Sequence, residues 1–248
     1  MSNFRFSLLF ITSMLGLSAN AEQIKVDTLK YGVVIEGSRV IYPSNSTGET
    51  LVVVNPQTYP VLVQTKILSE NKDKKAPFFV TPPLFRLDGT QRYSLRITKT
   101  GEVEENKESL YWACVKGIPP KADDLWAKDV NDNSQSNGGI GVKLNISIDN
   151  CIKLIVRPKN LKNNMLEHAE NIVWHKSGKD LIARNNSSFY MNIGSLEFNG
   201  VKLTPSYIPP EGERRFTLND KSDTKGVVAW SVIDDYGALS KTYSKKLN

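Results

Sequence analysis

The sequence of 248 residues has only two histidines and two cysteines. It also lacks the short motifs of common active sites: there is no H-E-x-x-H, G-x-S-x-G, P-loop or G-x-G-x-x-G. His175 stands beside Trp174 in a strand-like segment and is interpreted as a half-exposed strand residue. We therefore expect no enzyme, no catalytic residue, no cofactor and no metal site.

After residue 21 no apolar run approaches the roughly 18 residues that a membrane-spanning helix needs, so we do not expect a membrane-embedded protein. Residues 1–21 have the plan of a secretory signal peptide. Arg5 lies in a short basic head, a mainly apolar stretch follows from Phe6 to Leu17, and Ala19 and Ala21 occupy the positions that determine cleavage. We expect an exported chain that begins at Glu22.

Basic residues outnumber acidic ones by only 32 to 26, and they are scattered instead of clustered with aromatic residues. This pattern argues against a nucleic-acid partner. Export places Cys114 and Cys151 in an oxidising compartment, where a pair normally forms a disulfide, and a zinc site would require more ligands nearby. The bridge would close a loop of roughly 38 residues, worth about 4 kcal/mol. The alternative is two unrelated buried thiols.

Short segments rich in Val, Ile, Leu, Thr and aromatic residues predict β-strands along the whole chain, and no segment predicts an amphipathic helix. Their spacing favours an all-β fold of two sandwiches in tandem. A polar stretch opens after Arg157, so we expect a first domain at 22–157 and a second at 158–248. Hairpin turns are predicted at Ser177-Gly178 and Asn199-Gly200. The expected strands are 29–35, 39–42, 50–55, 60–68, 78–80, 84–87, 92–98, 109–116, 140–148, 152–157, 171–176, 180–185, 189–198, 214–218, 227–234 and 239–246.

The segment 140–149 alternates apolar residues with polar residues or glycine through ten positions. A period of two predicts a strand with one aliphatic face. The preceding residues 122–139 are polar and predict a long connection. A strand of this kind can complete its own core or the core of another protein. Its apolar residues are Ile140, Val142, Leu144, Ile146 and Ile148.

Six short motifs follow one another along the chain: GSRVIYP at 37–43, VTPPLFRL at 80–87, KESLYW at 107–112, IPP at 118–120, IKLIVRP at 152–158 and FYMNI at 189–193. In this order they resemble the PapD-like periplasmic chaperones of the chaperone/usher pathway. The resemblance implies two immunoglobulin-like domains, arranged in an L with a cleft between them. The insertion before Ile140 and its flanking cysteines resemble the long-loop subclass, which serves thin fimbriae and capsule-like adhesive polymers. The resemblance implies that a bridge between Cys114 and Cys151 holds the base of this loop in place.

The resemblance implies a function called donor-strand complementation, in which the chaperone lends its seventh strand, here about 140–156, to a subunit that lacks its last strand. The five alternating aliphatic residues would be the donor side chains. If all five were fully buried, they would contribute a gross ~7 to 15 kcal/mol. The expected partners are fimbrial or capsule-like subunits in the periplasm and an outer-membrane usher that receives them.

Two basic residues stand at positions that the family's motifs assign to subunit binding. Arg39 and Lys153 correspond to the pair that binds the subunit's C-terminal carboxylate in the cleft between the domains. The N-terminal segment is expected to contribute Ile24 and Val26 beside the donor strand. Because exposed aliphatic residues promote aggregation, we also expect the free protein to cap itself, either by forming a homo-oligomer or by loop collapse.

Two other protein classes are possible. A fimbrial or adhesin structural subunit would carry an apolar, alternating N-terminal extension and would lack a complete seventh strand, which is the opposite of this pattern. A carbohydrate-active β-sandwich enzyme would show paired carboxylates on strands. The acidic pair Asp234-Asp235 is instead interpreted as a solvated loop or turn.

Overall fold

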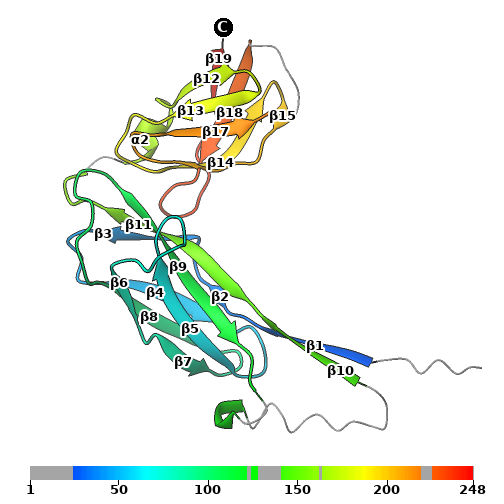
Figure 1. Ribbon diagram of the computed structural model, residues 1–248. Coiled ribbons are helices and arrows are strands. Elements are labelled where there is room, and N and C mark those ends of the chain that lie inside the picture. The colour runs from blue at the N-terminus through cyan, green and yellow to red at the C-terminus, as the bar shows by residue number, and fades with distance from the viewer. Residues whose placement is uncertain (1–24, 122–123, 128–140, 162–163, 219–224, 248) are drawn as a thin grey trace, which may run out of the picture.

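The computed structural model describes residues 25–121, 124–127, 141–161, 164–218 and 225–247. Two β-sandwiches lie in tandem and are set at an angle to each other (Figure 1). Helical structure in these ranges is limited to η1 (Leu125–Ala127) and α2 (Leu166–Ala169). Within the same ranges, no helix has the length and apolar character needed to cross a membrane. The all-β prediction is confirmed.

The first sandwich packs a five-stranded sheet against a four-stranded sheet. Side chains alternate between buried and accessible positions along strands such as β5, because successive residues of a strand point to opposite faces. The buried set forms one core that includes Tyr42, Leu51, Leu95 and Leu154. The first sheet has the order β3 (Arg39–Pro43), β11 (Asp149–Arg157), β9 (Ser109–Ile118), β5 (Val61–Leu68) and β7 (Leu84–Leu87); the second has β2 (Val34–Ile35), β4 (Glu49–Val54), β8 (Arg92–Lys99) and β6 (Phe78–Thr81).

The second sandwich has its own core, centred on the fully buried Trp230. Both hairpin turns predicted from the sequence are confirmed. Gly178 and Gly200 have φ angles of 58° and 78°, which glycine adopts without the steric cost of a side chain. One sheet has the order β12 (Val173–Ser177), β13 (Asp180–Arg184) and β17 (Glu213–Thr217); the other has β15 (Val201–Lys202), β14 (Met191–Phe198), β18 (Gly226–Val232) and β19 (Tyr243–Leu247), with β16 (Tyr207–Ile208) also paired to β14.

A fifth sheet lies outside both sandwiches. Strands β1 (Lys25–Tyr31) and β10 (Gly141–Ser147) pair in parallel and extend away from the first domain as a two-stranded ribbon (Figure 1). The sequence predicts a single strand from 29 to 35. The structure instead begins the strand at Lys25 and interrupts it after Tyr31, so that β1 belongs to the ribbon and β2 to the sandwich.

A small apolar cluster joins the two domains. Leu110 and Ile155 of the first domain are buried against Tyr190 of the second. Three half-buried side chains, Ile41, Trp112 and Tyr207, pack around them. This cluster lies at the junction between the two domains.

Candidate functional site

One face of the ribbon carries exposed aliphatic side chains. Val142 and Leu144 are each 48% exposed and Ile146 is 38% exposed, although each would be expected to lie in a core. Val26 is paired in register with Val142 and is 58% exposed. Paired residues of neighbouring strands share a face, so these four side chains form one apolar surface, which we call the ribbon face.

The opposite face of the ribbon has different chemistry. Asp27 pairs with Lys143, and Leu29 pairs with Asn145. Leu29 packs against the core of the first domain, whereas the three polar side chains are exposed. Strand β10 is therefore amphipathic: its aliphatic side chains lie on the ribbon face, and Lys143 and Asn145 lie on the other.

The ribbon also presents an edge of unpaired backbone groups. In the described part of the chain, β10 has β1 as its one partner strand. The N–H and C=O groups on its other edge have no strand to pair with there, and such an edge readily accepts an additional strand. Exposed aliphatic side chains and a free edge together are what strand addition requires.

Two of the predicted apolar residues, Ile24 and Ile140, lie outside the described residues. A third, Ile148, differs from the expectation of a donor side chain. It is half-buried against its own domain, where a Cβ atom added at Gly32 would stand only 2.8 Å from its Cβ. Its backbone N–H donates to Tyr31 O at 2.8 Å, and its C=O accepts from Gly117 N at 3.0 Å. Ile148 thus fixes the base of the ribbon to the sandwich.

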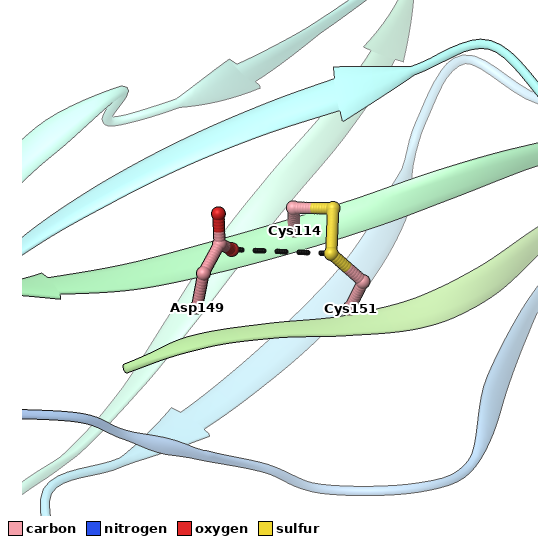
Figure 2. A group of neighbouring side chains, drawn as sticks. All are labelled: Cys114, Asp149 and Cys151. Carbon is pink, nitrogen blue, oxygen red and sulfur yellow. Dashed lines mark hydrogen bonds between the residues drawn. A yellow bond between two sulfur atoms is a disulfide. The ribbon is translucent and has the colours of Figure 1, made fainter. Parts of the chain in front are cut away.

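The predicted disulfide is present between Cys114 and Cys151 (Figure 2). The two residues face each other directly in the antiparallel pairing of β9 with β11, with a Cα–Cα distance of 4.0 Å. The bridge links β9, which precedes the long connection, to β11, which follows β10. It lies a few residues from the base of the ribbon. It therefore holds the start of β11 in place beside β9 while the ribbon extends outward.

The two predicted cations lie side by side. Arg39 on β3 and Lys153 on β11 are paired in register, and Trp112 on β9 is the next residue in the same row. Arg39 Nη1 donates to the backbone oxygen of Ile233 at 3.2 Å, so it reaches the second domain. Lys153 Nζ donates to Asn192 Oδ1 at 2.6 Å, also across the cleft. Both predicted side chains therefore lie at the junction of the two domains and contact the second one.

The two neighbouring cations repel each other, and partial burial adds to the cost of their charges. Burial, and secondarily the nearby Arg39, lowers the pKa of Lys153 from 10.5 to about 8. Burial also lowers the pKa of Arg39, although Asp235 and Asp234 oppose that shift. No ion pair within 4.0 Å is formed by either cation among the described residues. Two adjacent, half-buried cations without a close counter-ion are suited to bind an anion.

A charged network holds the domains together beside the cleft. Arg157, at the end of β11, donates from Nε to Glu108 at 2.7 Å and from both terminal nitrogens to Asp235 at 2.7 and 2.8 Å. Glu108 is buried and also accepts the backbone N–H of Tyr190 at 2.7 Å. Glu108 and Arg157 belong to the first domain, and Asp235 and Tyr190 belong to the second. The network therefore fixes the orientation of the two domains relative to each other.

This network corrects one interpretation drawn from the sequence. Asp235 is not merely a solvated turn residue, because its carboxylate accepts a hydrogen bond from each of the two terminal nitrogens of the Arg157 guanidinium. Asp234 does have the turn role, since its Oδ1 accepts the backbone N–H groups of Tyr236 and Ala238.

The comparisons with known proteins identify the family. The sequence profile of pili and flagellar-assembly chaperones, PapD N-terminal domain, matches residues 32–162. The profile of the pili assembly chaperone PapD, C-terminal domain, matches residues 167–244. The chain belongs to this family, the PapD-like periplasmic chaperones of the chaperone/usher pathway.

Individual relatives align with nearly the whole chain. Chaperone protein caf1M of Yersinia pestis is 46% identical over 241 residues, 94% of this chain and 93% of that protein. Chaperone protein AggD of Escherichia coli is 40% identical over 229 residues, 92% of this chain and 90% of the relative. The E. coli chaperone DraB superimposes with a TM-score of 0.77 at 38% identity, covering 90% of this chain and 100% of DraB. A structure of the Salmonella enterica SafA pilin in complex with the SafB chaperone gives a TM-score of 0.78 at 34% identity, with 90% and 100% coverage.

These findings confirm the family resemblance and the fold class, and they do not favour the alternative of a fimbrial subunit. The residues that surround the two cations were not predicted from the sequence. Glu108, Arg157 and Asn192 all stand inside the family motifs, so the motifs were a signal for them. Asp235 and Tyr207 lie in no motif, and only the tertiary structure brings them to the cleft.

Proposed function

We propose that this chaperone lends β10 to fimbrial or capsule-like subunits whose own fold lacks a strand. The observation that carries the proposal is the ribbon face, where aliphatic side chains stand exposed beside a free backbone edge. A subunit strand pairs with that edge, and Val142, Leu144 and Ile146 fill the subunit's groove. Ile140, together with Ile24 and Val26 of the N-terminal segment, extends the same contact, and we assign Ile148 to the base.

The energetics favour a contact shared between side chains and backbone. The three described side chains of β10 are already about half covered, so completing their burial contributes about 2 to 4 kcal/mol in total. This is much less than the ~7 to 15 kcal/mol expected for five fully buried residues. Backbone hydrogen bonds to the free edge add about 0.5 to 1.5 kcal/mol each. The subunit's own apolar groove, which is shielded from water in the same step, supplies the rest.

Hydrogen exchange tests the proposal directly. The amides of β10 that point away from β1 should exchange rapidly in the free protein and slowly once an exported subunit has been captured by co-expression. Amides of β13, in the second domain, provide the internal control and should not change. If a subunit is bound while β10 remains unprotected, the strand is not donated.

We propose that Arg39 and Lys153 bind the subunit's C-terminal carboxylate. A carboxylate accepts charge-assisted hydrogen bonds from both side chains and supplies the counter-ion that the cleft lacks. Since Lys153 lies on β11, the strand that directly follows β10 in the chain, an anchored chain end would also fix the register of the added strand. The Cys114–Cys151 bridge holds β11 in place and so keeps the distance between the cation pair and the ribbon constant.

Replacing Lys153 with methionine should weaken capture without lowering the melting temperature. The pKa of Lys153 is lowered by burial, so between pH 8 and about 10.5 the unfolded chain binds more protons than the folded chain, and this group makes stability rise with pH. The charge therefore costs stability, and its removal should leave the melting temperature equal or higher. Calorimetry and co-purification of a subunit measure the two effects.

The pH dependence of capture provides the control. Lys153 loses its charge as the pH rises through about 8, so capture should decline from pH 7 to 9 while the protein itself gains stability. The Lys153→Arg variant keeps its charge and should still capture subunits at pH 9. Lys116→Met, on the same sheet but outside the cleft, should behave like the wild type. A large fall in melting temperature for Lys153→Met would instead make this residue structural.

The remaining assignments complete the pathway. We place the domain boundary after Arg157 and expect residues 1–21 to be removed during export to the periplasm. The chaperone then works without catalysis: it delivers the subunit to an outer-membrane usher, where the next subunit replaces the donated strand. In the absence of a subunit, two copies can cover each other's ribbon faces and form a self-capped oligomer.

A further inference from the structure

The disulfide has a carboxylate beside it on the same face of the sheet. Asp149 stands two residues before Cys151 on β11, and both side chains point to the face shared with Cys114. The two sulfur atoms and one carboxylate oxygen all lie within 4.8 Å of one another. Figure 2 shows the carboxylate directed at the sulfur of Cys151.

The carboxylate is held in that orientation by a lysine. Asp149 Oδ1 lies 3.9 Å from Cys151 Sγ, whereas Oδ2 lies 3.2 Å from Lys66 Nζ. Lys66 on β5 is paired in register with Cys114, so it projects from the same face. One oxygen therefore points toward the sulfur atoms while the other is occupied by an ammonium group.

We propose that the reduced, dithiol form of the protein binds one zinc ion through Cys114, Cys151 and Asp149, with water as the fourth ligand. Thiolate and carboxylate groups are common zinc ligands, and four-coordinate tetrahedral geometry is usual. Two thiolates on such a zinc ion lie about 3.8 Å apart. Directly opposed residues on neighbouring strands reach that separation by small side-chain rotations, because the sulfur atoms already meet in the disulfide.

The surrounding charges suit this centre. Two thiolates and one carboxylate with Zn²⁺ have a net charge of −1, which Lys66 neutralises while it fixes the free oxygen of Asp149. Groups that orient a metal ligand in this way contribute strongly to affinity. The side chain of Asp149 is 37% exposed, so the ion has a path from solvent. The sequence analysis disfavours zinc for want of further ligands, and the carboxylate held by Lys66 supplies the missing one.

The chemistry requires the dithiol. A newly exported chain carries both thiols before oxidation, and a dithiol reductant regenerates them by exchange. In that exchange the reductant's two S–H bonds and the protein's S–S bond are lost, the reductant gains its own S–S bond, and both protons end on Cys114 and Cys151. Zinc binding then releases these two protons to solvent. Zinc and disulfide formation thus compete for the same two sulfur atoms.

The test is a metal titration of the reduced protein. The full mature chain is reduced with a phosphine, desalted without oxygen and checked for its fold by circular dichroism. Cobalt should bind in a 1:1 ratio with the absorption of a tetrahedral thiolate site, and zinc should displace it. Asp149→Asn and Lys66→Met should each weaken zinc binding by at least about tenfold. Zinc should also slow reoxidation by glutathione disulfide, and a chelator should restore the rate.

Two variants provide the controls. Cys114→Ser with Cys151→Ser should abolish the thiolate absorption, and Asp88→Asn should change nothing, because it removes an ion-paired carboxylate just after β7, away from the site. Zinc affinity that is the same in the Asp149→Asn variant and in the reduced wild type would overturn the proposal. If the reduced chain loses its fold, zinc should restore it with one equivalent bound, and failure to do so would also overturn the site.

Discussion

Replacing Leu144 with aspartate is expected to abolish subunit capture while leaving the free protein as stable as the wild type. Leu144 is half exposed on the ribbon face, so the folded chaperone tolerates a charge there with a change of stability within about 0.5 kcal/mol. In the complex the same carboxylate would enter an apolar groove without a partner and cost about 3 kcal/mol or more. Co-purification should therefore fall by at least about 100-fold.

The matched control introduces the same charge one residue further along. Asn145 is exposed on the opposite face of β10, so Asn145→Asp should retain capture. The pair of variants separates an effect on the ribbon face from a general effect of charge. Sedimentation should also show that Leu144→Asp is more monomeric than the wild type if two ribbon faces cap each other. Equal capture by both aspartate variants would contradict strand donation by this face.

Replacing Arg157 with methionine should give the largest loss of stability. Burial raises the pKa of Glu108 above its usual value, and the Arg157 guanidinium is the main group that opposes this shift. Without the guanidinium, Glu108 would be a buried carboxylate without its cation, and Asp235 would lose both hydrogen bonds. Breaking a buried pair in this way costs about 3 to 5 kcal/mol. Calorimetry should record a fall in melting temperature of roughly 6 °C or more.

A double variant tests whether the cost comes from the buried charge. Combining Arg157→Met with Glu108→Gln removes both charges, so part of the lost stability should return. The exposed pair between Arg184 and Glu213, 3.7 Å apart, is the control, and Arg184→Met should cost less than about 1 kcal/mol. Small-angle scattering should show a wider range of angles between the domains for Arg157→Met. If the melting temperature is unchanged, the network does not hold the domains.

The sequence predicted much of the architecture because the relevant signals are local. Alternation with a period of two marked the strand from 141 to 147, and glycine at 178 and 200 marked hairpin turns. The family motifs then placed Arg39 beside Lys153, which periodicity alone does not do. Export and the count of two cysteines were enough to predict the disulfide.

The rest depended on contacts between distant segments. Arg157 is 49 residues from Glu108 and 78 residues from Asp235, so no local pattern connects them. The parallel pairing of β1 with β10 likewise joins segments over 100 residues apart, and the apolar alternation near Val26 is only weak. Ile148 continues the apolar period, yet it is held by its own domain because Gly32 leaves room for it. Periodicity identifies a face but not what covers it.

The amphipathic ribbon affects the fraction of the chaperone that is free to capture a subunit. Its apolar face is open both to a subunit and to a second copy, whereas the polar face, with Asp27 and Lys143, attracts neither. Self-capping increases with the square of the chaperone concentration, while capture increases with the product of chaperone and subunit. If two copies cap each other as proposed, surplus chaperone is therefore held as capped oligomers when the cell makes more chaperone than subunit, and a rising supply of subunits releases it.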